Sequence, residues 1–209
     1  MMTEAQSTID KANAAHQRGM QMPRLLDYGM DFADATALFA PTSADEAWDL
    51  AAEQLGRARL EKADRAEEAG QTATAAEERR RAIAALVLAQ MAFNFDTPRK
   101  RQLYRDLVAT CHALGRVSDL PFRRCETPFG GKRLVGWLLR PPAARADGTV
   151  ILFGGQTGWG VAYLPVAHAL ARRNLAHCSS RGRDRARPGS GKASTSTSTW
   201  IPPTAPGST

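Results

Sequence analysis

Cysteine is scarce in this chain, which has only Cys111, Cys125 and Cys178 in 209 residues. The three are odd in number and widely spaced, and no C-x-x-C pair or Cys/His cluster occurs, so the sequence predicts neither a disulfide framework nor a zinc site. No metal or other cofactor is expected. The polar first 19 residues contain no apolar signal region, so we expect a cytoplasmic protein rather than a secreted one.

Long apolar runs are also missing. No stretch approaches the ~20 consecutive apolar residues that a membrane-spanning helix needs, so no membrane partner is expected. The composition, 43% hydrophobic and 23% charged, is typical of a globular protein with enough apolar material for a core. The length favours one or two domains.

Acidic residues are fewer than basic ones, and the formal net charge is +7. Such a balance invites a nucleic-acid partner. However, the last 31 residues carry five Arg or Lys side chains and one Asp, so more than half of the excess lies in that tail. The tail has no interleaved aromatic residues, and we therefore expect no nucleic-acid partner.

The N-terminal part of the chain is predicted to be helical, with residues 1–21 disordered and an α-helical layer over 22–116. Apolar spacing predicts helices over 31–39, about 43–69, 72–95 and 97–114. Ser43 and Glu46 have the spacing of a capping box, and Thr97 precedes Pro98 as an N-cap. Gly70 and Gly115 are predicted to end the second and fourth of these helices.

The pattern changes to short strands after Leu120. Strands are predicted over 122–129, 134–139 and 149–153, followed by a glycine-rich loop over 154–160 and a helix over 161–173. Residues 174–178 begin a further strand that we expect to remain incomplete, because residues 179–209 are predicted to be disordered. Strand, helix and strand form a βαβ unit, which predicts parallel pairing.

The segment TVILFGGQTGWGVAYLPVAHALARRNLA, residues 149–176, resembles the first parallel strand, oxyanion loop and first helix of α/β-hydrolases. The preceding PFRRCETPFGGKRLVGWLLRPP resembles their opening antiparallel strands. The helical segment resembles the cap of the 2,6-dihydropseudooxynicotine hydrolases and the fermentation-respiration-switch-like esterases. The resemblance covers about residues 22–178. It implies an α/β fold with a helical cap over 22–116 and a partial hydrolase core over 117–178.

The resemblance also implies a function, that of a serine hydrolase or carbon–carbon hydrolase of a small molecule whose substrate is selected by the cap. In such enzymes one oxyanion-hole N–H comes from the loop after the first parallel strand, and Gly155 and Gln156 are the matching positions here. A plain βα turn is the alternative interpretation of the same residues.

The nucleophile that this chemistry requires is missing from the sequence. No G-x-S-x-G string occurs, and Ser190, the nearest serine between glycines, has the wrong spacing and no apolar strand before it. We therefore expect a truncated and inactive hydrolase. In the family an apolar strand continues beyond Ala176, so a change of reading frame is one hypothesis for the tail.

Other site candidates are weaker. The loop 154–160 matches neither G-x-G-x-x-G nor a phosphate-binding P-loop. His168 is interpreted as a surface or packing residue. Cys111 and His112 are adjacent and point different ways on a helix, so Cys111 is expected in the core. Residues 79–81, three arginines, are interpreted as a solvated helix face with local ion pairs.

Two alternatives to a hydrolase remain. The helical segment could form a tetratricopeptide-like interaction module without catalysis, although no ~34-residue self-similarity supports it. A basic-tailed nucleic-acid binder ranks last. A homodimer is left open.

Overall fold

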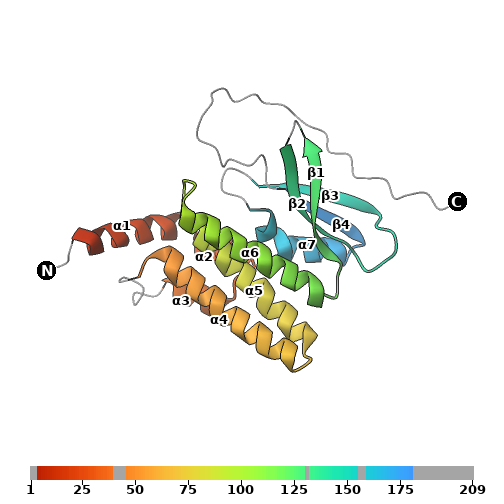
Figure 1. Cartoon of the computed structure of the whole chain (residues 1–209), viewed down its shortest axis with the longest axis horizontal. Helices are drawn as coiled ribbons and strands as arrows, with labels where there is room; N and C mark the ends of the chain where they lie inside the picture. Colours follow the sequence, from red (N-terminus) through yellow and green to blue (C-terminus); the bar gives the residue numbers. More distant parts are fainter. Residues whose placement is uncertain (1–3, 40–45, 130–131, 155–158, 181–209) are drawn as a thin grey trace.

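The computed structural model describes residues 4–39, 46–129, 132–154 and 159–180. A helical layer precedes a small sheet in the chain, and the two pack against each other (Figure 1). The predicted combination of a helical cap with the first strands of an α/β sheet is confirmed. None of the described helices is both long enough and apolar enough to cross a membrane.

Within the described residues, six helices form the layer: α1 (Glu4–Gly19), α2 (Met22–Asp27), α3 (Phe32–Phe39), α4 (Trp48–Glu68), α5 (Thr72–Met91) and α6 (Pro98–Val117). The central element is α5, which packs against both α4 and α6. Its second half, residues 82–90, is buried throughout. In this half of the helix the side chains on every side are buried, and all but Gln90 are apolar. α5 therefore runs through the middle of the core instead of along one of its faces.

Residues 4–19 form α1, which corrects the prediction that residues 1–21 are disordered. Asn13 holds this helix against the start of α4. Its side-chain oxygen accepts a hydrogen bond from the Trp48 N–H at 3.0 Å, and its amide donates to the Glu46 carbonyl at 2.9 Å. His16 stacks on the Trp48 ring with centroids 5.6 Å apart. These contacts depend on residues more than thirty positions away, so local periodicity could not reveal them.

The start of α4 also differs from the prediction. The helix begins at Trp48 after Ala47, so Glu46 precedes the first turn instead of closing a capping box with Ser43. Ser43 lies outside the described residues. At the other end the prediction is confirmed, since α4 ends at Glu68 and Gly70 adopts a left-handed φ of 71°.

Ion pairs join α3, α4 and α5. Arg59 reaches Asp34 at 2.7 Å and Glu78 at 3.0 Å, and these hydrogen bonds raise the pKa of its guanidinium. The expectation of a solvated arginine face is wrong for Arg79, which is 3% exposed. Arg79 bonds Asp64 at 2.9 Å and also contacts Glu67. A buried cation has to be paired, and here α4 supplies both carboxylates.

The last cap helix, α6, begins as predicted, with the Thr97 hydroxyl accepting the Lys100 N–H at 3.1 Å. It does not end at Gly115 but runs on to Val117. A Cβ at position 115 would lie 2.6 Å from the Phe122 carbonyl oxygen. Glycine is therefore used here for close approach of the first strand rather than for a helix stop.

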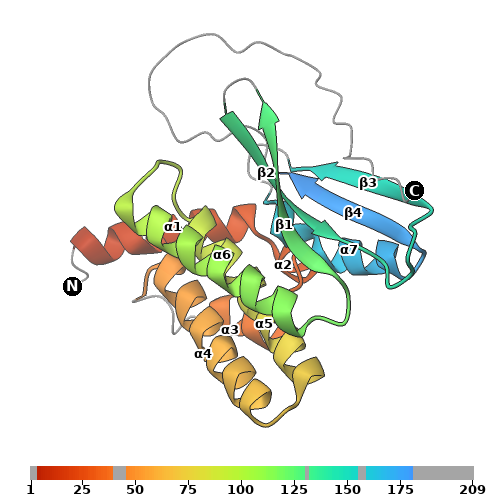
Figure 2. The same ribbon diagram turned by 45° about the vertical axis from the view of Figure 1, so that its right-hand side comes forward.

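The sheet contains β1 (Phe122–Phe129), β2 (Lys132–Leu139), β3 (Gly148–Phe153) and β4 (Leu175–Ser180) in the order β1-β2-β4-β3. The β1–β2 and β2–β4 pairs are antiparallel, and β3 pairs with β4 in parallel, which confirms the predicted βαβ unit. The 3₁₀ helix η2 (Gly160–Tyr163) and α7 (Leu164–Ala171) connect β3 to β4. Figure 2 shows β4 between its two neighbours with α7 behind the sheet.

The strand that we expected to remain incomplete is therefore formed. It reaches Ser180 and occupies an inner position of the sheet. Residues 175–180 have few large apolar side chains, yet His177, Cys178 and Ser179 are all at most 4% exposed. Burial comes from two neighbouring strands and the helices, which a sequence pattern does not reveal.

Candidate functional site

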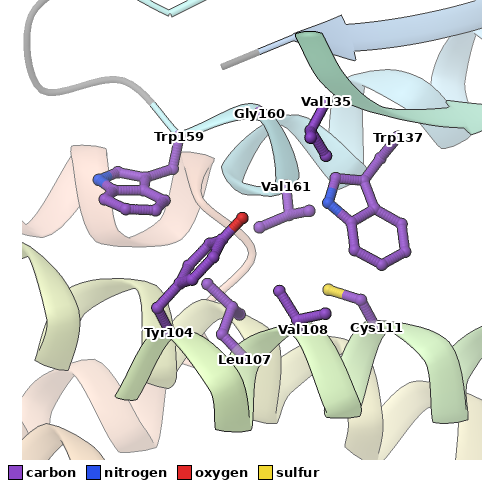
Figure 3. Close-up of a pocket in the computed structure, with 9 residues that line it drawn as sticks. All are labelled: Tyr104, Leu107, Val108, Cys111, Val135, Trp137, Trp159, Gly160 and Val161. Carbon is purple, nitrogen blue, oxygen red and sulfur yellow. The ribbon is translucent and has the colours of Figure 1, made fainter. Parts of the chain in front are cut away.

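A pocket lies between the cap helix α6 and the sheet (Figure 3). The gap between its walls has about 350 Å³ of empty space, part of which is open to solvent, and its enclosed part has room for about one water-sized molecule. Nine residues from three segments line it: Tyr104, Leu107, Val108, Cys111, Val135, Trp137, Trp159, Gly160 and Val161. The pocket is therefore narrow and mostly apolar, and the two layers of the molecule meet around it.

The cap contributes one stripe of α6 to the pocket. Tyr104, Leu107, Val108 and Cys111 follow the i, i+3, i+4, i+7 spacing that places side chains on one helix face. The Tyr104 hydroxyl points toward the η2 side of the pocket in Figure 3. Burial raises the pKa of the Cys111 thiol, which therefore stays protonated and serves as an apolar wall rather than a nucleophile.

The sheet contributes Val135 and Trp137, which are two residues apart on β2 and so share a face. The Trp137 ring is fixed from both sides. Phe122 stacks on it with centroids 5.1 Å apart, and the His112 ring lies 5.3 Å away. His112 packs against Trp137 and is not among the residues that line the pocket, whereas its neighbour Cys111 is.

The third wall is the segment that follows the glycine-rich loop. Trp159 lies 6.0 Å from Tyr104, ring centroid to ring centroid. At Gly160 a Cβ would lie 2.9 Å from the Ser179 hydroxyl oxygen, so glycine lets η2 sit directly on β4. The end of the loop is in this way fixed against the sheet and beside the pocket.

Comparison with known proteins addresses the fold. No family model matches the sequence, and no curated protein does either. Among solved structures, the chain is similar to one described as 2,6-dihydroxy-pseudo-oxynicotine hydrolase, with a TM-score of 0.65 and 17% sequence identity. The chain has the fold of part of an α/β-hydrolase.

The α/β-hydrolase fold is matched over 76% of this chain but only 44% of the solved hydrolase. A second solved structure, described as AbyA5 wildtype, matches 75% of this chain and 43% of its own length, with 19% identity and a TM-score of 0.49. The chain thus spans less than half the length of either protein.

The strand that leads into the predicted oxyanion loop is present. β3 lies in the sheet as expected and runs to Phe153, and Gly154 follows it. Gly155 and Gln156, the predicted oxyanion-hole positions, lie outside the described residues, and so does Ser190. The predicted role of the loop N–H groups therefore stays a prediction.

His168 lies on α7 and is a packing residue rather than a surface residue, the two interpretations that the sequence allowed. It is half-buried, and burial followed by the charge of Arg80 lowers its pKa. It does not line the pocket. Within the described residues, no group of three or more His, Cys, Asp or Glu side chains could hold a metal ion.

Sequence reasoning missed the aromatic pocket. Its signal was partly visible, because the α6 stripe contains Tyr104 among leucines and valines at helical spacing. Nothing in the sequence indicated that this stripe faces Trp137 and Trp159, which are 33 and 55 residues further on. The α6 stripe and the two tryptophans meet only because the helical layer packs against the sheet.

Proposed function

We propose that this chain forms the cap and the first part of the sheet of a hydrolase acting on a small, mainly apolar molecule with an aromatic or acyl group. The observation that carries the proposal is the pocket. Its walls come from α6 of the cap, β2 of the sheet and the segment after β3. In an α/β-hydrolase fold the segment after this strand is the one that can supply an oxyanion-hole N–H.

The lining determines which ligands fit. The described lining residues include no Asp, Glu, Lys or Arg, so a charged group would lose hydration there without gaining an ionic partner from them. Tyr104 and Trp159 offer aromatic contact surface to a ligand ring. Trp137 contributes less, because Phe122 stacks on it and His112 packs against it. A serine esterase or a carbon–carbon hydrolase is the activity proposed for the whole enzyme, with Gly155 and Gln156 as the oxyanion donors.

We expect this chain to bind a ligand without hydrolysing an ester. The 209 residues contain no G-x-S-x-G nucleophile turn. The chain should therefore bind an aromatic probe but not hydrolyse p-nitrophenyl butyrate above the buffer rate. Hydrolysis at ordinary enzyme rates that persists in Ser190→Ala would show that a nucleophile has been overlooked and would overturn this part of the proposal.

Binding can be measured at pH 6 with p-nitrophenol, which is then mainly the neutral phenol and quenches tryptophan fluorescence at close range. We expect saturable quenching that is strongly reduced in Trp137→Phe and in Trp159→Phe. Trp48→Phe is the matched control, because Trp48 packs against Phe39 away from the pocket and its loss should leave the quenching of the remaining indoles intact.

A variant that fills the pocket completes the test. Val108→Phe should weaken p-nitrophenol binding at least tenfold, since it adds a ring to a lining position that is only half-buried. Equal quenching in wild type, Val108→Phe and both pocket tryptophan variants would show that the probe binds elsewhere, and the pocket would then not be the binding site.

A further inference from the structure

Two of the three cysteines meet on the sheet face opposite the pocket. Cys125 is on β1 and Cys178 on β4, and their sulfur atoms lie 3.9 Å apart, within hydrogen-bonding distance for thiols. Trp137 and Ser179 point toward the pocket and η2. Their neighbours Gly136 and Cys178 therefore face the other way, because successive residues of a strand alternate.

The meeting depends on a glycine in the strand between. Cys125 pairs with Gly136 on β2, and β2 pairs in turn with β4. A Cβ at Gly136 would lie 3.2 Å from the Cys125 sulfur and 3.6 Å from the Cys178 sulfur. Side chains two strands apart are normally separated by the residue between them, since each strand spacing is about 4.8 Å. Gly136 has no side chain to separate them, so the two sulfur atoms can meet above it.

The two thiols differ in exposure. Cys178 is 4% exposed, whereas Cys125 is only half-buried and open to small reagents. A hydrogen bond from Cys178 lowers the pKa of the Cys125 thiol to about 7, and the positive charge of Arg123 and the backbone N–H of Gly136 act in the same direction. The same hydrogen bond raises the pKa of Cys178.

The other side chains on this face do not compete for the thiolate. By strand alternation, the described residues that β2 and β4 place near the pair on this face are uncharged: Leu134, Gly136, Leu138, Ala176 and Ser180. Lys132, the charged residue of β2 on this face, lies at the far end of the hairpin, where it pairs with Phe129. On β1, Arg123 and Thr127 flank Cys125, and only Arg123 is charged. The Cys178 thiol, as hydrogen-bond partner, and the charge of Arg123 both favour the anionic form of the Cys125 sulfur.

We propose that Cys125 is an oxidation site for hydroperoxides and that Cys178 is the positioning residue that activates it across Gly136. The Cys125 sulfur attacks the terminal oxygen of the hydroperoxide, so that an S–O bond forms as the O–O bond breaks. The departing alkoxide or hydroxide takes a proton from water. Sulfur is oxidised by two electrons to a sulfenic acid, and the hydroperoxide is reduced to an alcohol or to water.

The sheet keeps the reaction from continuing to an internal disulfide. A disulfide needs an S–S distance of about 2.05 Å and Cα atoms within about 6.8 Å. The sulfurs start 3.9 Å apart, and β2 stays paired between the two strands that carry them. Two strand spacings amount to roughly 9–10 Å, so closing the bond would require distortion of the sheet. The sulfenic acid should therefore accumulate and be open to external thiols.

The test uses the full chain with hydrogen peroxide and dimedone, read by peptide mass spectrometry. We expect a dimedone adduct at Cys125 and none at Cys111, whose thiol is buried in the core. Labelling of Cys111 as fast as Cys125 would overturn the proposal, because selectivity would then be absent. Rapid formation of a Cys125–Cys178 disulfide in the folded protein would overturn the geometry on which it rests.

The role of Cys178 is tested by the pH profile of Cys125 alkylation with iodoacetamide. In wild type the rate should have its midpoint near pH 7. Cys178→Ala removes the hydrogen-bond donor and should raise the midpoint by about one to one and a half pH units, toward an ordinary cysteine.

Cys178→Ser keeps a donor at nearly the same size and should leave the midpoint close to that of wild type. If Cys178→Ala is poorly folded, Cys178→Val takes its place, because valine also lacks a hydrogen-bond donor but is closer to cysteine in size. A midpoint near 8.5 in wild type, or one that neither Cys178 variant alters, would show that Cys178 does not activate Cys125.

Discussion

At the scale of single residues, His177 is the side chain whose environment has the clearest consequence for stability. It is 2% exposed in the inner strand β4, and its Nε2 atom has no hydrogen-bond partner among the described residues. Burial lowers the pKa of this imidazole to about 4. The folded protein thus holds it neutral at pH values where an unfolded chain would protonate it.

The pH dependence follows from that difference. The unfolded imidazole takes up a proton near pH 6.5 and the folded one only near pH 4, so stability is lost as pH falls between these values. We expect the urea midpoint to drop between pH 7.5 and pH 5, and to drop less in His177→Gln.

Part of the decrease should remain in that variant, because burial also lowers the pKa of His16 and His168. An identical decrease in wild type and His177→Gln would show that His177 is not held neutral. Double substitution of His177 and His168 should flatten the profile further.

Residue-level interpretation from sequence succeeded where a local rule applies. Thr97 before Pro98 and Gly70 after α4 were predicted from capping and left-handed turns, which involve only neighbouring residues. It was wrong for Arg79, because a run of charged residues does not reveal which of them faces another helix. The meeting of Cys125 and Cys178 was equally invisible, since it depends on Gly136 in a third segment.

At the scale of elements, α1 and α4 are joined by one side chain. Asn13 caps α4 from another helix, because Ala47 at the N-cap position has no side-chain oxygen to offer. Asn13→Ala should lower the free energy of unfolding by about 1 kcal/mol, the typical effect of losing a cap. Thermal or urea denaturation followed by circular dichroism measures it.

The control for that substitution is Lys11→Ala on the exposed side of α1, which should change stability by less than about 0.5 kcal/mol. Asn13→Asp should keep most of the cap, since it retains an oxygen for the Trp48 N–H. Equal stability of Asn13→Ala and Lys11→Ala would mean that α1 does not cap α4.

The elements themselves were more predictable than their partners. Apolar spacing located α3 to α6, and alternating or short apolar runs located β1, β2 and β3. The spacing failed for α1, whose stability comes from distant contacts. It also failed for the pocket, because the two faces that form it come from segments with separate and individually ordinary patterns.

At the scale of the whole molecule, the sheet has an exposed edge. Within the described part of the chain, β3 pairs only with β4, and Phe153 at its end is 60% exposed. Unpaired strand edges with apolar residues promote association. Phe153→Lys should therefore reduce concentration-dependent self-association in sedimentation velocity experiments while leaving the circular dichroism spectrum unchanged.

A matched control is Phe95→Lys, since Phe95 is 81% exposed but lies in the connection before α6, away from the sheet. It should have little effect on sedimentation. If both variants reduce association equally, exposed apolar area in general is responsible. If neither does, the β3 edge is not a contact between copies.

The order β1-β2-β4-β3 also has a consequence for how the protein is made. The ribosome releases the chain from its N-terminus, and β4 is the last of the four strands to emerge. Until then β1 and β2 can form only a hairpin, and β3 has no described strand to pair with. The helices can fold early from local contacts. The sheet is completed late, in one step, when residues 175–180 pair with both β2 and β3.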